Sequence, residues 1–356
     1  MFDKTRALLK QFEQMDIPGY DLLVYQHGQP ILRWHYGHSD YERLISVNGT
    51  ERYNLYSCSK PITCTAALQF MEQGQFKLND ALCDYMPEFA HMSVRAEEGL
   101  RPANRPILIR DLFCMTAGFS YDLYAPALMR AREETNGRCP TREVMRYLAQ
   151  EPLLFDPSAS WNYSLCHDVL AALVEVVAGE SFEAYVQKHI FQPLGMTSAT
   201  YLPTLQDEAS LCAQYRFDEA SGTYCPVASN AYRLGSEYAS GGAGCIATVD
   251  DYMRFLEGLR KCELLKAETL DLMIRNQLTP AMESAYPYNE RYGYGLGVRC
   301  PKAGVSTDFG WGGAAGAVLG IDLKAELSIY YAQHVLSAPN ETKKIEVIRC
   351  VCEDLA

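Results

Sequence analysis

Hydrophobic and polar residues change their spacing several times along the first quarter of the chain. Helical spacing of apolar positions predicts a helix over residues 2–15. Alternation then predicts two strands, at residues 21–25 and 31–37, joined by a turn at residues 27–30. A longer apolar run predicts a second helix over residues 58–73. The chain is therefore expected to begin with a helix, a β-hairpin and another helix.

These strand signals fade in the middle of the chain and return near its end. Between about residues 78 and 238, apolar positions punctuated by Pro and Gly predict helices at 109–116, 141–150, 164–178 and 182–191. After the glycine-rich run 241–244, the predicted elements are a helix at 249–260, strands at 292–298, 317–322 and 327–333, and a last amphipathic helix at 341–355.

Strands at both ends and helices between them favour an α+β fold. We expect one antiparallel sheet, built from both termini and flanked by helices, with a mainly helical domain inserted into it. The sheet domain would be discontinuous and comprise residues 1–77 and 239–356. The inserted domain would comprise residues 78–238.

Composition and charge narrow the possible partners. The chain has 356 residues, of which 48% are hydrophobic, so it can bury a full core. Its 44 acidic and 32 basic residues give a net charge of -12, which disfavours nucleic acid and anionic membranes as partners. Small-molecule substrates remain, and the sequence leaves the oligomeric state open.

Cysteine usage and the N-terminal sequence bear on location. The 13 cysteines are scattered through apolar stretches and form no C-x-x-C motif. An odd number cannot pair completely, so buried thiols in a reducing compartment are favoured over disulfides or zinc ligands. The first residues lack the apolar run of a signal peptide, and no segment reaches the roughly 20 apolar residues of a membrane span. We expect a cytoplasmic protein without a metal or organic cofactor.

One short motif carries candidate chemistry. Ser57 and Lys60 form an S-x-x-K pair at the predicted start of a helix, where three residues make almost one turn and place both side chains on one face. Both lie near the positive end of the helix dipole. This arrangement suits a nucleophilic serine beside its proton acceptor. The pattern alone is weak evidence, because it arises by chance about once in a chain of this length.

Other segments occur in an order that is typical of one enzyme family. They are residues 109–118, which begin with Ile109-Arg110-Asp111-Leu112, residues 157–164 with Tyr163, residues 191–196, residues 241–244 and residues 310–313. Together with the S-x-x-K pair, this series resembles the class C β-lactamase-like serine hydrolases over nearly the whole chain. The resemblance implies the β-lactamase/transpeptidase-like form of the fold expected above.

The resemblance also implies roles for individual residues. Ser57 would be the nucleophile, Lys60 its activating partner and Tyr163 the second proton-transfer group. The backbone amides of Ser57 and Ala314 would form the oxyanion hole. Free lysine and tyrosine have pKa values near 10.4 and 10, so neither is a competent base at neutral pH. The ammonium of Lys60 would favour the phenolate form of Tyr163, and partial burial would make Lys60 easier to deprotonate. The two groups are expected to titrate as a unit, which leaves the dominant base open.

Two positions depart from the pattern of the lactamases and peptidases. Leu165 stands where they usually have Asn two residues after the tyrosine, and Trp311 stands where they have Lys or His. Both changes remove polar recognition groups, and Trp311-Gly312-Gly313 resembles the W-G-G motif of the esterase and transacylase branch. We assign Leu165, Trp311, Gly312 and Gly313 to substrate binding, together with Tyr121. Tyr121 and the loop at residues 286–292 could form the wall of an acyl pocket.

The sequence therefore predicts a serine hydrolase with an acyl-enzyme on Ser57, acting as a carboxylesterase or acyltransferase on small esters. The alternative among enzymes is amide chemistry: a β-lactamase, a D-amino-acid peptidase or an amidase. The alternative from another class is a catalytically silent binding protein of the same fold. His167 is interpreted as a structural histidine, and Asp168 beside it as an acid that suits the helix dipole.

Overall fold

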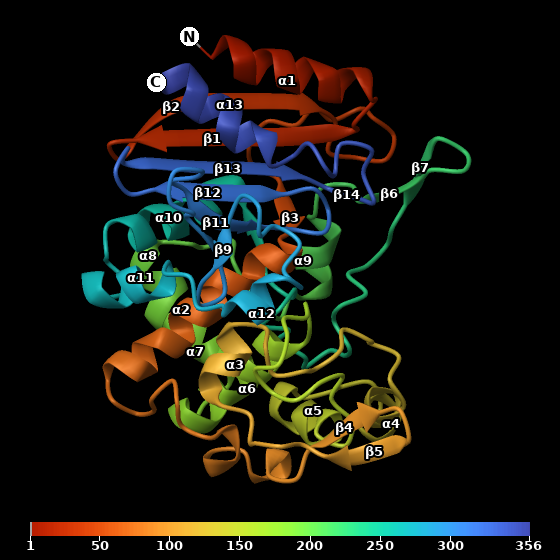
Figure 1. Ribbon diagram of the computed structural model, residues 1–356. Helices are drawn as coiled ribbons and strands as arrows, with labels where there is room; N and C mark the ends of the chain where they lie inside the picture. Colours follow the sequence, from red (N-terminus) through yellow and green to blue (C-terminus); the bar gives the residue numbers. More distant parts are fainter. Residues whose placement is uncertain (1) are drawn as a thin grey trace.

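The computed structural model describes residues 2–356 and has a seven-stranded antiparallel sheet across its upper half (Figure 1). The strand order is β2-β1-β13-β12-β11-β10-β9. Two strands come from the N-terminal hairpin and five from the last part of the chain: β1 Gly19–Gln26, β2 Gln29–Gly37, β9 Gly293–Tyr294, β10 Arg299–Cys300, β11 Phe309–Gly312, β12 Val318–Asp322 and β13 Leu327–Gln333. The predicted α+β fold, with a sheet built from both termini, is confirmed.

Helices cover both faces of this sheet. Helices α1 (Asp3–Gln14) and α13 (Glu346–Leu355) lie side by side on one face, and α10 (Val249–Arg260) packs against β1 and β13 on the other. Successive side chains of a strand point to opposite faces, so Leu22 joins the apolar cluster under α1 and α13 while Leu23 joins the cluster on the other side. Both faces are buried, which explains why β1 is apolar without strict alternation.

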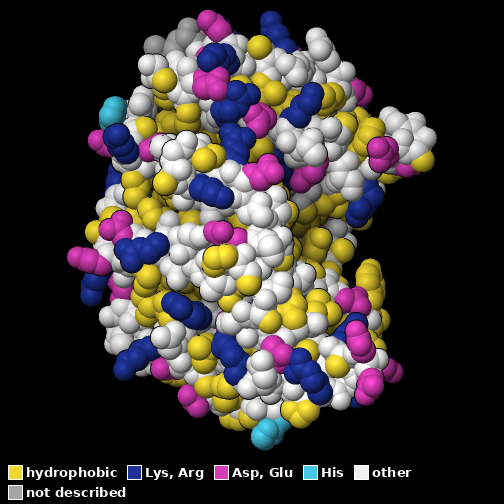
Figure 2. Space-filling model, viewed as in Figure 1, with side chains coloured by type: hydrophobic (Ala, Val, Ile, Leu, Met, Phe, Trp, Pro, Cys, Tyr) yellow, Lys and Arg dark blue, Asp and Glu magenta, His cyan; other side chains and the backbone are white. Residues whose placement is uncertain are grey.

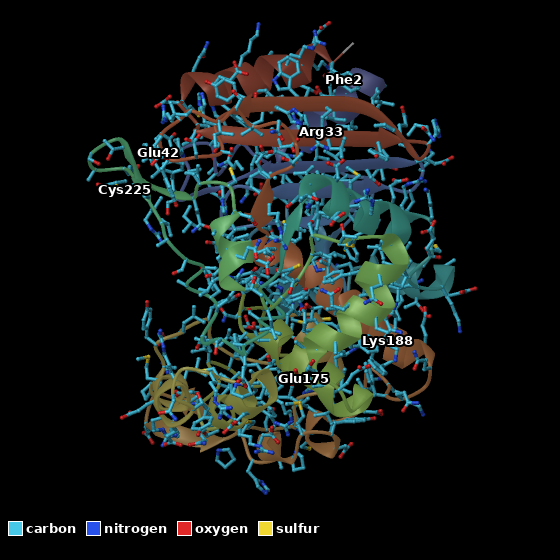
Figure 3. All side chains as sticks on the ribbon, turned by 180° about the vertical axis from the view of Figure 1, so that it is seen from behind. Phe2, Arg33, Glu42, Glu175, Lys188 and Cys225 are labelled. Atoms are coloured by element: carbon cyan, nitrogen blue, oxygen red, sulfur yellow. The ribbon has the colours of Figure 1, made fainter. Side chains whose placement is uncertain are left out.

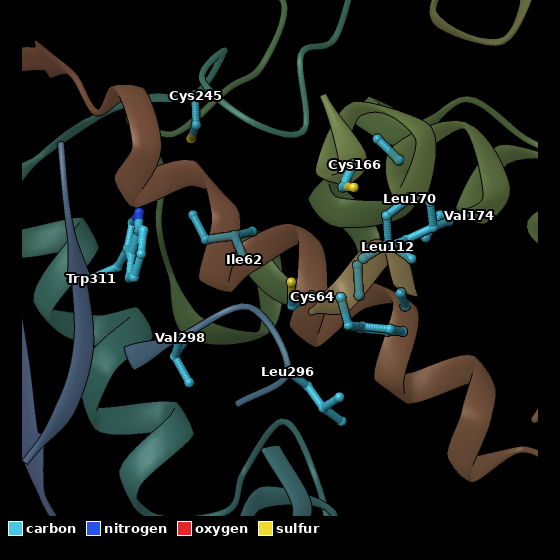
Figure 4. Packing of buried hydrophobic residues seen from close by; sticks show 14 of the residues in the cluster. Ile62, Cys64, Leu112, Cys166, Leu170, Val174, Cys245, Leu296, Val298 and Trp311 are labelled. Carbon is cyan, nitrogen blue, oxygen red and sulfur yellow. The ribbon is translucent and has the colours of Figure 1, made fainter. Parts of the chain in front are cut away.

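Helix α2 (Ser59–Glu72) runs through the centre of the molecule. Its residues from Ser59 to Leu68 are all buried, because it packs against α6 (Cys166–Ala178) and is covered on every side. Figure 4 shows the apolar side chains around it, with Ile62 and Cys64 on α2, Leu170 on α6 and Leu296 from the C-terminal part of the chain. This core fixes the N-terminal end of α2 relative to the sheet.

Most of the remaining elements lie, in sequence, between the N-terminal strands β1 and β2 and the C-terminal strands β9 to β13. The helices are α3 Ile109–Phe113, α4 Pro126–Glu134, α5 Thr141–Leu148, α7 Phe182–Val186 continued by a π-helical turn Gln187–Phe191, α8 Gln192–Leu194, α9 Leu205–Ala209, α11 Ala267–Met273 and α12 Pro280–Glu283. Short 3-10 turns occur at Tyr56–Cys58, Leu82–Asp84 and Pro87–Phe89. The small strands are β3 Arg52–Asn54, β4 Ser93–Ala96, β5 Gly99–Pro102, β6 Tyr215–Asp218, β7 Thr223–Pro226, β8 Ile246–Thr248 and β14 Val335–Leu336.

Two hairpins in the middle of the chain, β4-β5 and β6-β7, were not predicted from the sequence. Their residues are largely exposed, so they lack the apolar alternation that marks a strand half-buried on a core. Seen from behind, the β6-β7 hairpin projects from the side of the molecule with Cys225 on it (Figure 3). The division into units 1–77 with 239–356 and 78–238 stays a prediction.

Three predicted elements are clearly shorter than expected, and one of them is the helix predicted at residues 109–116, which ends at Phe113. The strand predicted at residues 292–298 pairs only over Gly293–Tyr294, because Gly297 has a φ of +85° and the amide of Gly295 turns back to donate to Val298. The last helix begins at Glu346 instead of residue 341, and the residues before it form turns.

Within residues 2–356 all thirteen cysteines are free thiols. In the same part of the chain, each helix is too short or too polar to cross a membrane.

Candidate active site

Ser57 lies in a 3-10 turn, Tyr56–Cys58, that leads directly into α2. Tyr56 has a φ of +48°, a left-handed conformation that is uncommon for a residue with a side chain and is often found beside functional groups. Its buried hydroxyl donates to Gln214 Oε1 at 2.8 Å, which anchors the turn. The turn thus holds the hydroxyl of Ser57 at the N-terminal end of the central helix.

The two side chains that the sequence assigns to proton transfer both contact Ser57. Lys60 Nζ lies 3.2 Å from Ser57 Oγ, one helical turn along the chain. The hydroxyl of Tyr163, 106 residues further on, donates a short hydrogen bond to the same oxygen. The structure therefore brings together the three side chains to which the sequence assigns proton transfer and nucleophilic attack.

Lys60 is completely buried, and burial lowers the pKa of its ammonium to about 7, although the nearby Asp168 carboxylate opposes this effect. Its Nζ donates to Gly242 O at 2.7 Å and lies 3.4 Å from the hydroxyl of Tyr121. It also sits over the ring of Tyr163, 4.5 Å from the centroid. A large fraction of Lys60 is consequently a neutral amine near pH 7.

Asp168, which the sequence interpretation treated as a helix-end acid, belongs to this site. It is fully buried at the start of α6, and its Oδ1 accepts hydrogen bonds from Tyr238 (3.0 Å) and Ser240 (2.6 Å). A Cβ placed on Gly242 would be 2.6 Å from Asp168 Oδ2 and 3.4 Å from Lys60 Nζ, so the two charged groups are no more than about 6 Å apart. The sequence offered no signal that these two groups lie near each other, since the acid is 108 residues from the lysine.

The glycine-rich run at residues 241–244 has a packing role here. A Cβ on Gly241 would lie 2.3 Å from His167 O, and one on Gly242 would overlap Asp168. Only a segment without side chains can approach α2 and α6 this closely. The close approach brings the carbonyl of Gly242 to Lys60.

Burial shifts the pKa of Tyr163 upward, whereas it shifts the pKa of Lys60 downward. Burial raises the pKa of its phenol above the ordinary range, although hydrogen bonds with Ser57 and with Trp311 Nε1 (3.5 Å) lower it in part. Its ring stacks with the rings of Tyr121 (centroids 5.3 Å apart) and Trp311 (5.9 Å). The mutual assistance expected from the sequence is therefore one-sided: the amine loses its proton easily and the phenol keeps its own.

The end of β11 lies beside the Ser57 turn. Gly313 packs so closely that a Cβ on it would be 2.7 Å from Leu55 O. Gly313 O accepts from the amide of Gly316 at 3.1 Å, which makes residues 313–316 a β-turn with Ala314 at its first central position. Figure 4 shows Trp311 projecting from this strand toward the N-terminal part of α2.

The site opens into a cavity of about 970 Å³. The cavity walls are rich in aromatic side chains, with few charged groups among them; the aromatic residues are Tyr56, Tyr121, Tyr124, Trp161, Tyr163, Tyr232, Tyr288, Tyr292 and Trp311. Figure 2 shows the molecule hollowed on one side, between its upper and lower parts, where hydrophobic atoms gather. The hollow can receive a hydrophobic ligand of considerable size.

Most residues assigned from the sequence lie at this cavity, and one does not. Those that line it are Ser57, Tyr121, Tyr163, Trp311, Gly312, Gly313 and Ala314, with Lys60 directly behind Ser57. Leu165 is 2% exposed, packs in the core before α6 and is not among the residues that line the cavity. Its buried position does not support its assignment to substrate binding. The reason is local: the chain turns into α6 immediately after Tyr163.

His167 is also not among the residues that line the cavity. It is fully buried, its Nε2 lies 3.3 Å from Phe113 O, and burial lowers the pKa of its imidazole to about 3. It is a neutral histidine of the core. Within residues 2–356, no three His, Cys, Asp or Glu side chains are grouped so that they could hold a metal ion.

The chain is similar to known proteins over most of its length. A family model described as beta-lactamase matches residues 5–352. Esterase EstB from Burkholderia gladioli is 28% identical over 333 residues, covering 86% of this chain and 83% of EstB. Monacolin J acid methylbutanoyltransferase from Aspergillus terreus is 30% identical over 241 residues, covering 64% of this chain and 58% of that enzyme.

Solved structures share the fold over the whole length. The LovD6 mutant of simvastatin synthase from Aspergillus terreus superposes with a TM-score of 0.81 at 24% identity, covering 100% of this chain and 99% of that one. EstCE1, a hydrolase with promiscuous acyltransferase activity, superposes with a TM-score of 0.79 at 24% identity, covering 98% and 97%. The predicted β-lactamase/transpeptidase-like arrangement is confirmed by these likenesses.

Proposed function

The chain belongs to the β-lactamase family of serine hydrolases, and from that premise we propose that it is a carboxylesterase or acyltransferase whose acyl-enzyme forms on Ser57. The observation that carries the proposal is the double contact at Ser57 Oγ. A lysine whose pKa is lowered to about 7 and a tyrosine hydroxyl both reach this oxygen at the base of an aromatic cavity.

Acylation would begin with attack of Ser57 Oγ on the ester carbonyl carbon while the neutral amine of Lys60 takes the serine proton. The carbonyl oxygen becomes negatively charged and would face the amides of Ser57 and Ala314. When the carbon–oxygen bond to the alcohol breaks, Tyr163 gives its hydroxyl proton to the leaving alkoxide. Tyr163 regains a proton from the Lys60 ammonium, so both groups return to their starting states.

Deacylation would use the same groups in reverse. Water or an acceptor alcohol attacks the acyl-enzyme, and its proton passes through Tyr163 to Lys60. Ser57 Oγ leaves and takes the proton back from the lysine. In this assignment Lys60 is the dominant base and Tyr163 a neutral relay, because burial lowers the pKa of the amine and raises that of the phenol.

The walls of the cavity support esters with hydrophobic acyl groups in preference to β-lactams or peptides. Trp311 provides an indole where lactamases and peptidases have a cationic side chain, and its ring is stacked on Tyr163. The cavity, at about 970 Å³, is also larger than a short ester needs. The matched relatives include an esterase and an acyltransferase of methylbutanoyl groups, which agrees with either water or an alcohol as acceptor.

Labelling and rate measurements test this proposal together. Intact mass spectrometry after treatment with a fluorophosphonate should show one adduct on the wild type and none on Ser57→Ala. The wild type should hydrolyse p-nitrophenyl butyrate, and Ser57→Ala should lose that activity.

A chromogenic cephalosporin separates the two kinds of substrate. Hydrolysis of the butyrate with little turnover of the cephalosporin is the expected result. Preference for the cephalosporin would refute the argument from Trp311, and an unlabelled wild type would instead support the silent binding protein.

A further inference from the structure

We propose that Lys344 is a positioning residue for the oxyanion hole, acting through the peptide group between Gly313 and Ala314. Lys344 Nζ donates a 2.8 Å hydrogen bond to Gly313 O. That carbonyl belongs to the same peptide group as the N–H of Ala314. The inference rests on the function proposed above, in which this N–H is one of the two donors to the oxyanion.

The geometry of the peptide group connects the lysine to the donor. A trans peptide is planar, with its C=O and N–H on opposite sides, so a cation bound to Gly313 O lies on the side away from the Ala314 N–H. Ser57 and Ala314 line the same cavity, and Gly313 packs against the turn that carries Ser57. The lysine can therefore fix and polarise the donor without occupying the position of the oxyanion.

The turn leaves this N–H available. Gly313 O also accepts from the amide of Gly316 at 3.1 Å, and the amide of Gly313 donates to Ala317 O at 2.8 Å. Ala314 occupies the first central position of the turn, and within residues 2–356 its amide donates to no backbone carbonyl. Two hydrogen bonds to one carbonyl oxygen, one of them from a cation, hold the plane of the peptide.

The charge of Lys344 matters because the reaction creates charge nearby. A cation on the carbonyl oxygen favours the polarised form of the amide, in which the N–H is a stronger donor. The strengthened donor stabilises the tetrahedral oxyanion more than the neutral ester, so the effect is expected in kcat. The side chain of Lys344 is only 12% exposed, which limits screening by water.

The neighbouring chain supports this placement. Glu341 Oε1 accepts from Lys344 Nζ at 2.5 Å and keeps the ammonium directed. Asn340 exchanges hydrogen bonds with Gln333 of β13 at 3.1 and 2.9 Å, which ties the turns before α13 to the sheet. The sequence predicted a helical conformation for residues 341–345, and the turns they form instead bring Lys344 to Gly313.

The test compares Lys344→Met, Lys344→Arg and the control Lys343→Met, an exposed lysine one residue away, on a neutral ester. Lys344→Met should lower kcat about 10-fold with KM changed less than about 2-fold, a smaller effect than complete loss of an oxyanion donor. The affinity for a phenylboronic acid, whose tetrahedral adduct carries the oxyanion, should fall by the same factor. Lys344→Arg should recover most of kcat, and Lys343→Met should match the wild type.

The outcomes separate this inference from the proposed function and from an alternative role. The same variants are also assayed on an ester that bears a carboxylate. If Lys344→Met raises KM for that ester alone and leaves the neutral ester unaffected, Lys344 is a substrate anchor and the inference is overturned. Wild-type kcat and boronate affinity in Lys344→Met would also overturn it. Thermal unfolding of each variant shows whether it is folded. If Lys344→Met does not fold, Lys344→Arg decides: an inactive Lys344→Arg overturns the inference, and an active Lys344→Arg with wild-type boronate affinity supports it. A wild type that neither labels nor turns over esters would contradict the proposed function instead.

Discussion

Replacing Asp168 with Asn should shift the acid limb of the ester-hydrolysis profile to lower pH. Lys60 accepts the serine proton only as the neutral amine, so kcat/KM falls as pH drops through the pKa of Lys60, which is about 7. The Asp168 carboxylate raises that pKa by attracting the ammonium. Removing the negative charge should therefore lower the pKa and preserve activity in more acidic solution.

The structure sets the size of this shift. Lys60 Nζ and Asp168 Oδ2 are separated by no more than about 6 Å, and at an effective dielectric constant of about 20 Coulomb's law gives about 3 kcal/mol, equal to about 2 pKa units. Burial also raises the pKa of Asp168, which works against the full negative charge assumed in this figure. We expect the limb to move by about 1 to 2 units.

The assay is kcat/KM for p-nitrophenyl butyrate across the acid range, because this parameter reports the pKa values of the free enzyme. Asp122→Asn is the matched control: it removes an exposed carboxylate that lines the same cavity, and solvent screening should hold its shift below about 0.3 unit. Asn at position 168 can still accept from Tyr238 and Ser240 through its side-chain oxygen. An unshifted limb in Asp168→Asn, or one moved to higher pH, would refute the electrostatic reasoning.

Three further predictions concern the same framework. Tyr163→Phe should lower kcat about 10²- to 10³-fold with little change in KM, since it removes a proton relay, and a kcat within about 3-fold of the wild type would exclude that role. Gly242→Ala should lower both esterase activity and the free energy of unfolding, the latter by about 1–3 kcal/mol in urea titration, because its Cβ would meet Asp168 Oδ2 at 2.6 Å; unchanged stability would contradict the close packing. Arg299→Met should lower the free energy of unfolding by about 3–5 kcal/mol in the same titration, because the buried Asp308 carboxylate, 2.6 Å from the guanidinium, would keep only the Tyr292 hydroxyl and lose its cation; a loss below about 1 kcal/mol would contradict this pairing.

The parts of the fold that depend on local spacing were predictable. The β1-β2 hairpin, β13 and α10 appear close to the residues predicted for them, because each buries apolar side chains against the same sheet core. The exposed hairpins β4-β5 and β6-β7 were missed because they bury little apolar surface. Their pairing depends on backbone hydrogen bonds, which leave no apolar pattern in the sequence.

The candidate site divides in a similar way. The spacing of Ser57 and Lys60 is local, and Tyr163 was identified through the order of family segments. The contacts of Lys60 with Gly242 and of Lys344 with Gly313 join residues 182 and 31 positions apart, and only the folded chain creates them. A family position also does not determine where a side chain points, as buried Leu165 shows.

The most direct test of the account is to trap the acyl-enzyme. Wild-type protein mixed with p-nitrophenyl butyrate and quenched in acid should yield a peptide containing Ser57 that is heavier by one butyryl group, and Ser57→Ala should yield no butyrylated peptide. Butyrylation of another residue, or turnover of the ester by Ser57→Ala at the wild-type rate, would contradict the central claim that Ser57 is the nucleophile.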